Sequence, residues 1–454
     1  MPRPDARELW RLGAVAVIGA TSVLVIALWL RGGGIAALVA VNAETLNTLG
    51  RITGLVSANL LLYQVLLMAR VPLFERGFGR GGIVRMHRST GFWSFWLMIA
   101  HIVLICAGYA AQQRVNVFVQ LWQFVWDYPG MLLATAGTLL LIAVVVLSMR
   151  RVRSRMRYES WHLLHLYGYL GAGLAVPHML WTGADFSGSA TATVYWWLLW
   201  AATAAAVIVF RVVRPVWRSL TLDLRVDAVE PDGIRGVWVR VRGRGVHRLG
   251  AQAGQFFVWR FLDGAGWMRG HPFSVAAAPT GDALTLSAQV IGDGTERLRR
   301  LRPGTRVLVE GPFGIMTRPP RTGGRLLMVG AGSGISPLVA LLEAEAYPPG
   351  GATLVTRDHT AEHGLRRAAI ARLVAERGLR HVDLPGARNA VTPTWLPATH
   401  AAWTGVGVLR WLVPHIDDCD VFVCGPDLWQ QAVVADLRTA GVASPRIRTE
   451  SFTP

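Results

Sequence analysis

Six long apolar runs in the first 215 residues constrain the fold of this 454-residue chain more than any other feature. Each run is long enough to cross a hydrocarbon core about 30 Å thick. In lipid, a helix satisfies its backbone hydrogen bonds within a single segment. The sequence therefore predicts a six-helix transmembrane bundle. Its spans lie near residues 12–31, 51–69, 89–110, 130–149, 161–181 and 193–212.

The placement of arginine predicts the orientation of these spans. Arginines cluster in the N-terminal tail and after the second, fourth and sixth spans, whereas the opposite side has only Arg31, Arg51 and Arg114. By the positive-inside rule, both termini of this integral protein are expected on the cytoplasmic side of the bacterial plasma membrane. The first run is expected to remain as a span, because it is long and no small-residue cleavage site follows it.

The charge distribution also bears on partners. The formal net charge is +18, and arginine supplies all of the basic side chains because the chain has no lysine. Most of this excess lies beside apolar spans, which argues against a nucleic-acid partner. The clusters at 150–157 and 211–218 are expected to contact anionic lipid. The cysteines offer no disulfide framework, zinc spacing or iron–sulfur quartet. They are Cys106, Cys419 and Cys424.

Four histidines lie in two of the apolar runs. His87 and His101 are fourteen residues apart in the third run, which places them about 21 Å apart and within about 40° of one helix face. The fifth run carries His165 and His178 and is expected to cross in the same direction. His87 would then face His165 near the cytoplasmic side, and His101 would face His178 near the outer side. Two imidazoles on opposite sides of one iron make a low-spin electron-transfer haem. The alternative is a set of structural polar residues that bond neighbouring helices.

The second pair raises a geometric difficulty. His165 and His178 are thirteen residues apart, so a straight helix would leave them about 140° apart. Glycines in the run and Pro177 could bend the helix and redirect His178. His162 is the alternative to His165, although its spacing is no better. The sequence thus predicts two haems b and favours His165 over His162 as this ligand.

The second half reads as two soluble domains. Short alternating strands between Gly, Asp and Pro turns predict an antiparallel β-barrel over 216–320. The pattern then becomes α/β over 321–454, beginning with a buried strand and the turn "GAGSGISP". The glycines of this turn let the backbone approach a pyrophosphate, and a proline is tolerated in the first turn of the helix that follows. The residues concerned are Gly330, Gly332, Gly334, Ser336 and Pro337.

The residue after the next strand bears on nucleotide choice. The strand "ATLVTRD" carries Arg357 at its end. A cation there suits the 2′-phosphate of NADPH. Asp358 beside it leaves NADH as the alternative nucleotide. The sequence favours NADPH.

The histidine spacings resemble those of the ferric reductases and NADPH oxidases, which have a six-span haem core. The segment "LGRITGLVSANLLLYQVLLMAR" (49–70) also resembles the second span of that family. The resemblance places an arginine near the outer haem, and the matching residue is Arg51. The alternative for Arg51 is an interfacial arginine whose side chain reaches the membrane surface.

The soluble motifs resemble the ferredoxin-reductase-type FAD and NAD(P) modules in order and spacing. They are "GQFFVWRF" (254–261), "HPFSVAAAPT" (271–280), "IGDGTERLRRL" (291–301), "GPFG" (311–314) and "CGP" (424–426). The resemblance implies that Pro272 and Phe273 line the flavin and that the Ser274 hydroxyl bonds it near its reactive nitrogen. His271 stands where soluble members have arginine and the oxidase branch has histidine.

The resemblance assigns further residues to the two nucleotides. The loop "GDGT", with Gly292, Gly294 and Thr295, would hold the FAD pyrophosphate. Cys424, Gly425 and Pro426 would lie over the nicotinamide. Phe452 would cover the flavin until the nicotinamide displaces it, unless the chain end is a frayed tail.

These expectations combine into one function. The predicted domains are a transmembrane haem domain (1–215), an FAD-binding β-barrel (216–320) and an NAD(P)-binding domain (321–454). Electrons from cytosolic NADPH would pass through FAD and two haems b to an acceptor on the outer face. Molecular oxygen, giving superoxide, is favoured because Arg51 and the histidine spacings match the oxidase branch. Ferric-chelate reduction and electron donation to a separate periplasmic protein are the alternatives. A nucleotide-sensing channel is disfavoured, because "RRVRSRMR" lies outside the apolar runs.

Overall fold

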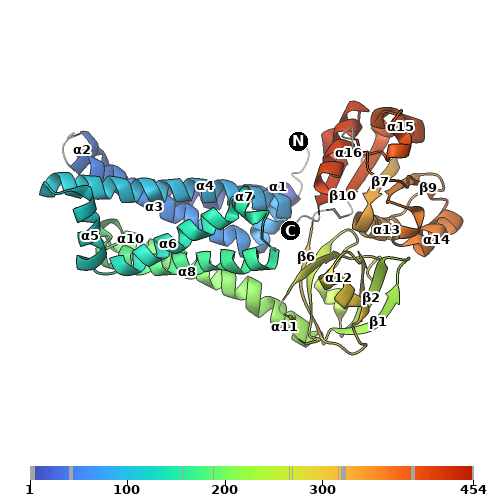
Figure 1. Cartoon of the computed structure of the whole chain (residues 1–454), viewed down its shortest axis with the longest axis horizontal. Helices are drawn as coiled ribbons and strands as arrows, with labels where there is room; N and C mark the ends of the chain where they lie inside the picture. The colour runs from blue at the N-terminus through green and yellow to red at the C-terminus, as the bar shows by residue number, and fades with distance from the viewer. Residues whose placement is uncertain are drawn as a thin grey trace. The chain divides into compact units, whose positions relative to one another are not determined.

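The computed structural model describes residues 6–39, 44–156, 158–187, 189–264, 266–267, 269–314, 316–317, 324–389 and 394–451. They belong to two units, Met1–Val212 and Val213–Pro454. Figure 1 shows helices in the first unit and sheets with helices in the second. The predicted division of the second half into an FAD domain and an NAD(P) domain stays a prediction.

The first unit is built from helices. Among the described residues, five helical segments are long and apolar enough to cross a membrane, and the last of them runs on past Val212: Glu8–Arg31, Glu44–Met68, Gly81–Gln113, Met131–Ser148 and Ala190–Thr221. The helices are α1 (Ala6–Arg31), α2 (Gly34–Val39), α3 (Glu44–Met68), α4 (Pro72–Gln113), α5 (Val117–Asp127), α6 (Met131–Ser148), α7 (Arg150–Arg153), α8 (Tyr158–Thr182), α9 (Ala184–Ser187) and α10 (Ala190–Ile208).

The predicted fifth span corresponds to α8. This segment is helical over its whole length, but it is not among the five apolar segments found in the described part of the chain. Its three histidines lower its mean hydropathy. The structure therefore supports several membrane helices, and the count of six stays a prediction.

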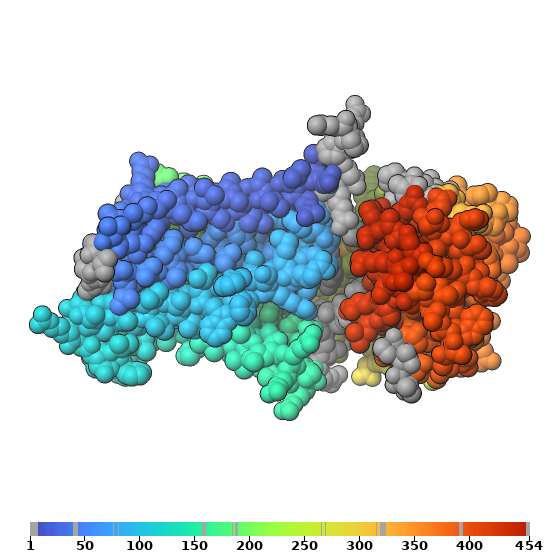
Figure 2. Space-filling view, turned by 90° about the horizontal axis from the view of Figure 1, so that it is seen from above, coloured from blue at the N-terminus to red at the C-terminus, as the bar shows by residue number. Residues whose placement is uncertain are grey.

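Two close helix pairs organise the first unit. Between α3 and α4, the Ser57 and Ser94 hydroxyls each donate to the other residue's carbonyl, at 2.7 and 3.0 Å. Between α6 and α8, a Cβ added to Gly171 would lie 3.0 Å from the Gly137 carbonyl oxygen. Small residues let helix backbones approach in this way. Figure 2 shows part of the outer surface of α1, α3 and α4 in blue.

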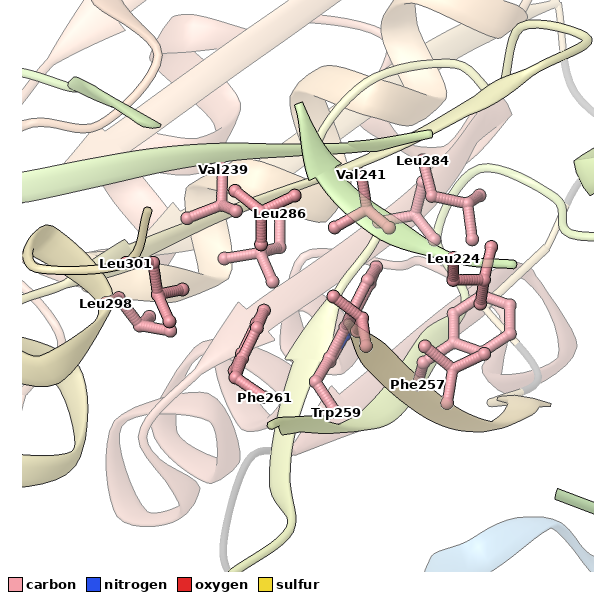
Figure 3. Close-up of a cluster of buried hydrophobic side chains, with 14 of the residues drawn as sticks. Leu224, Val239, Val241, Phe257, Trp259, Phe261, Leu284, Leu286, Leu298 and Leu301 are labelled. Carbon is pink, nitrogen blue, oxygen red and sulfur yellow. The ribbon is translucent and has the colours of Figure 1, made fainter. Parts of the chain in front are cut away.

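The second unit begins with two antiparallel three-stranded sheets. They enclose a core in which Phe257, Trp259 and Leu286 are fully buried (Figure 3). The first sheet has the order β1-β2-β5, with β1 (Arg225–Pro231), β2 (Gly236–Arg242) and β5 (Ala283–Gln289). The second has the order β4-β3-β6, with β3 (Phe256–Phe261), β4 (His271–Ser274) and β6 (Val307–Phe313). Helix α11 (Arg214–Thr221) packs on β6, and α12 (Asp293–Arg299) contributes Leu298 to this core.

These sheets differ in one respect from the predicted β-barrel. Single bridges join them, between Arg225 and Arg306 and between Val275 and Leu286. A closed barrel needs continuous ladders between all neighbouring strands. The described residues form two linked sheets around one core, and closure of a barrel is not confirmed.

The rest of the second unit is a five-stranded parallel sheet, which agrees with the predicted α/β fold. Successive residues of a strand point to opposite faces, and Leu327 and Met328 accordingly enter different cores. The order is β11-β10-β7-β8-β9, with β7 (Arg325–Ala331), β8 (Ala352–Arg357), β9 (Arg380–Asp383), β10 (Cys419–Gly425) and β11 (Ile447–Ser451). The helices are α13 (Ile335–Ala344), α14 (Arg367–Arg377), α15 (Gly405–Leu412) and α16 (Asp427–Thr439).

Candidate functional site

The four predicted histidines come together in two pairs. The ring centroids of His87 and His165 are 6.0 Å apart, and those of His101 and His178 are 6.2 Å apart. In each pair α4 supplies one ring and α8 the other. Helix α8 continues through Pro177, and His165 and His178 both face histidines of α4. His165 is the residue that faces His87, whereas the ring of His162 lies beside Trp161.

Backbone carbonyls hold the two histidines of α4. Nδ1 of His87 lies 3.1 Å from the Gln64 carbonyl oxygen, and Nδ1 of His101 lies 2.7 Å from that of Gly50. A carbonyl oxygen only accepts, so each Nδ1 carries the hydrogen and each Nε2 keeps a lone pair. Gly54 makes room for this arrangement, because an added Cβ would lie 2.5 Å from Nδ1 of His101. Both imidazoles are therefore in the form that binds a metal through Nε2.

The spacing of both pairs fits a metal ion between the rings. Two metal–nitrogen bonds of about 2 Å, together with the distance from each Nε2 to the centroid of its own ring, add up to about 6 Å between the two centroids. Each histidine pair would thus suit the iron of one haem. Haem iron held in this way would supply one-electron chemistry.

Arg51 lies beside the outer pair and has a partner that the sequence did not indicate. Its Nε donates to Oδ2 of Asp185 at 2.6 Å, and its Nη2 donates to Oδ1. A two-pronged arginine–carboxylate contact is among the stronger hydrogen-bonded pairs. Arg51 follows Gly50, which holds His101, and Asp185 lies shortly after His178. The ion pair therefore joins α3, whose Gly50 carbonyl oxygen holds His101, to α9, which follows the helix that carries His178.

The residues predicted to bind the flavin gather around β4. His271 stacks on Phe273 with ring centroids 6.1 Å apart, and Ser274 is buried at the end of the strand. A Cβ added to Gly294 would lie 2.8 Å from Cε1 of His271, so the "GDGT" loop reaches this strand. The Thr295 hydroxyl accepts from the Gly292 N–H at 3.3 Å and caps its own loop. These residues therefore lie close together, and their binding of FAD stays a prediction.

The glycine-rich turn and the "CGP" loop meet at the ends of β7 and β10. Gly332 has a φ of +57°, a left-handed conformation that favours glycine. A Cβ added to Gly334 would contact the Cys424 carbonyl oxygen and lie 2.9 Å from the Gly425 nitrogen. The Ser336 hydroxyl, in the first turn of α13, is buried and has no hydrogen-bond partner in the described part of the chain. A helix N-terminus of this kind suits a pyrophosphate.

Cys424 is a packing residue in this structure. It is fully buried, and its Sγ donates to the Glu450 carbonyl oxygen at 3.4 Å. Burial raises the pKa of this thiol well above its ordinary value, which disfavours the thiolate. Pro426 lies just after β10, at the N-cap of α16. Phe452, predicted to cover the flavin, lies outside the described residues.

Arg357 points its guanidinium at backbone carbonyls. Nη1 donates to the carbonyl oxygens of Asp358 and Gly386 at 2.6 and 2.8 Å, and Nη2 donates to that of Ala387 at 3.1 Å. The side chain thus fixes the loop after β9. Its predicted contact with a 2′-phosphate stays a prediction.

Asp358 is a buried carboxyl whose ionisation should affect stability. Gln289 donates to its Oδ1 at 3.0 Å, while Oδ2 is buried without a partner in the described part of the chain. Burial is the main cause that raises the pKa of Asp358 to about 6, and the Gln289 hydrogen bond opposes it. The pKa of Asp358 is higher in the folded state than in the unfolded state. The protonated Asp358 therefore makes its full contribution to stability below about pH 4, and this contribution is lost as the pH rises through about 6.

We therefore expect Asp358→Asn to flatten this pH dependence. The variant should gain about 1–3 kcal/mol in free energy of unfolding at pH 8 and little at pH 4. Thermal unfolding of the detergent-solubilised protein at both pH values measures the change. Asp282→Asn, at a carboxyl that is 71% exposed, is the control. Equal pH dependence in Asp358→Asn and the parent would contradict the expectation.

Comparison with known proteins agrees with both halves of this description. The family model described as Ferric reductase like transmembrane component matches residues 53–176, which include His87, His101 and His165. Respiratory burst oxidase homolog protein E of Arabidopsis thaliana is 30% identical over 100 residues, which cover 16% of this chain and 10% of that protein. These matches support the ferric reductase/NADPH oxidase superfamily. A ferric-reductase-like transmembrane module is fused to a ferredoxin-reductase-type module.

Other relatives are ferredoxin reductases. The ferredoxin reductase component of 3-ketosteroid-9-alpha-monooxygenase from Rhodococcus rhodochrous is 24% identical over 239 residues, or 52% of this chain and 65% of that protein. Ferredoxin--NADP reductase B of Sorangium cellulosum is 37% identical over 75 residues, or 16% of this chain and 31% of that protein. The chain thus spans less than two thirds of each of these curated relatives.

Solved structures similar to the chain include the Amycolatopsis cytochrome P450 reductase GcoB. It has a TM-score of 0.43 and 24% identity, and the match covers 51% of this chain and 70% of that one. The flavohem-like FAD/NAD binding domain of nitric oxide dioxygenase from Vibrio cholerae has a TM-score of 0.42 and 19% identity, and the match covers 52% of this chain and 100% of that one.

Proposed function

We propose that this chain is an NAD(P)H-dependent flavohaem oxidoreductase that moves electrons from cytosolic NADPH to an acceptor on the outer face of the membrane. The observation that carries the proposal is the pair of facing histidines at each of two levels, with ring centroids 6.0 and 6.2 Å apart. When bound, FAD would convert hydride transfer into single-electron transfer, and two haems b would carry those electrons across the bilayer.

Each group of residues then has a defined task. His87 and His165 hold the inner iron, and His101 and His178 hold the outer one. Ser274 and the strand before it orient the flavin. The Gly330–Gly334 turn binds the nucleotide pyrophosphate, and the "CGP" loop lies over the nicotinamide. Six spans with both termini in the cytoplasm place the second unit on the side where NADPH is found.

We propose molecular oxygen as the acceptor, with superoxide as the product. The Arg51–Asp185 ion pair supports a neutral acceptor, because Asp185 offsets the charge that would attract an anionic ferric chelate. Turnover of the purified protein with NADPH, in oxygen or in ferric citrate without oxygen, tests this. We expect superoxide formation to be the faster reaction. Ferric citrate reduction at a higher rate would exclude oxygen as the main acceptor.

Electron donation to a separate periplasmic protein is the second candidate. The match to the ferredoxin reductase component of a monooxygenase favours it, because that name gives a protein, ferredoxin, as the electron acceptor. Slow turnover with both oxygen and ferric citrate, together with rapid haem reduction by NADPH, would support this candidate.

Replacing Arg357 with alanine tests the choice of nucleotide. If its guanidinium also reaches a 2′-phosphate, Arg357→Ala should raise KM for NADPH far more than KM for NADH. A lost charged contact of this kind is worth about 1.5–3 kcal/mol. Steady-state kinetics with both nucleotides measures the difference. An equal rise for NADPH and NADH would mean that Arg357 acts only through the loop at Gly386 and Ala387.

A further inference from the structure

Two hydroxyl groups contact the α8 histidines, and neither was predicted from the sequence. Ser148, the last residue of α6, lies with its Oγ 3.1 Å from Nδ1 of His165. Thr182, the last residue of α8, lies with its Oγ1 3.3 Å from Nδ1 of His178. Each histidine pair therefore contains one ring held by a backbone carbonyl and one ring that faces a hydroxyl.

The other contacts of these hydroxyls assign the hydrogens. The Ser148 hydroxyl donates to the Val144 carbonyl oxygen at 2.7 Å, and the Thr182 hydroxyl donates to that of His178 at 2.6 Å. A hydroxyl has one hydrogen and two lone pairs. In both residues the carbonyl contact is the shorter one, so the single hydrogen lies there. The hydroxyl oxygen can then only accept from the imidazole.

This assignment sets the tautomer of both rings. Nδ1 of His165 and of His178 must carry the hydrogen, so each Nε2 keeps the lone pair that a metal requires. A hydrogen bond accepted from Nδ1–H raises the basicity of a metal-bound imidazole, and hydrogen bonding around an iron centre is one of the protein's means of setting its reduction potential. A more basic ligand stabilises the ferric state and lowers the potential.

We propose that Ser148 and Thr182 are positioning residues, one for each haem, that fix the tautomer and rotation of His165 and His178 and lower the potential of the iron each ring binds. The proposal rests on the proposed function, since it needs haem between the histidines. It adds to that function the residues that tune each iron separately.

Alanine and conservative variants of the complete, haem-loaded protein test the proposal. Ser148→Ala should raise the midpoint potential of one haem and alter its low-spin electron paramagnetic resonance signal. Thr182→Ala should do the same to the other haem. Ser148→Thr and Thr182→Ser keep a hydroxyl and should stay close to the parent. Thr135→Ala is the matched control, because the Thr135 hydroxyl donates to the Met131 carbonyl oxygen at 2.8 Å within α6.

The same alanine variants, made in a His101→Leu protein, show which haem each change in midpoint potential belongs to. In a His101→Leu protein, which should keep only the inner haem, Ser148→Ala should still raise the potential and Thr182→Ala should not. Loss of one haem in an alanine variant supports the proposal if the conservative variant retains that haem, and overturns it if the conservative variant also loses it.

The outcomes separate this proposal from the function on which it rests. A parent protein without haem would end the proposed function. A parent with two low-spin haems, whose potentials and resonance signals are unchanged in both alanine variants, would overturn the positioning role and leave the proposed function intact.

Discussion

Replacing His101 with leucine should remove one of two haems from each chain. The imidazole of His101 faces His178 and is held through Nδ1 by the Gly50 carbonyl oxygen. Leucine has no lone pair to bind iron, so the outer site loses one axial ligand, whereas His87 and His165 are untouched. Reduction of the flavin by NADPH should stay at the parental rate, and electron delivery to the outer acceptor should be abolished.

Three measurements check this expectation: haem content per chain, the reduced visible spectrum and stopped-flow flavin reduction. His162→Leu is the matched control, because the ring of His162 lies beside Trp161 on α8, whereas His165 is the residue whose ring faces His87. That variant should keep both haems. Retention of two haems in His101→Leu would exclude His101 as a ligand. Loss of a haem in His162→Leu would mean that His162, and not only His165, is needed to hold the inner haem.

A methyl group at Gly334 should impair hydride transfer while FAD remains bound. In Gly334→Ala the new Cβ would contact the Cys424 carbonyl oxygen and the Gly425 nitrogen, which are backbone atoms that no rotamer change can move. Overpacking of this kind typically costs about 1–3 kcal/mol, equivalent to about fivefold to 150-fold in rate or affinity. The turn and the "CGP" loop should separate, and kcat/KM for NADPH should fall accordingly.

Flavin content, KM for NADPH and the rate of flavin reduction measure this effect. Gly281→Ala is a suitable control in the same unit, because nothing lies within 4 Å of a Cβ added at Gly281. Flavin content should match the parent in both variants. Parental kinetics in Gly334→Ala would show that contact between the turn and the loop is not needed for nucleotide binding.

The sequence by itself determined the features that depend on local pattern. Apolar runs of membrane length identified helices in the first unit, and period-two alternation identified the short strands of the second. The glycine-rich turn was recognisable because it lies between a buried strand and a helix. Histidine spacing was enough to expect two pairs. Thr182 could also have been found, since it lies four residues after His178 on the same helix face.

The sequence could not supply contacts between residues far apart in the chain. Ser148 meets His165 only because α6 packs on α8 through Gly137 and Gly171. Arg51 and Asp185 are 134 positions apart, and no periodicity relates them. The count of six spans stays a prediction, because the histidines that give α8 its proposed function make it less apolar than a typical span.

Only the tertiary structure decided which imidazole faces which and where each Nδ1 hydrogen goes. His162 and His165 have similar sequence surroundings, and the choice between them followed from the position of α4 against α8. Arg357 likewise faces the carbonyls at Gly386 and Ala387, although its position at a strand end suggested a phosphate ligand. The physical reason is that periodicity fixes the face of a helix or strand, whereas the partner of a polar atom depends on which helix, strand or loop packs against that face.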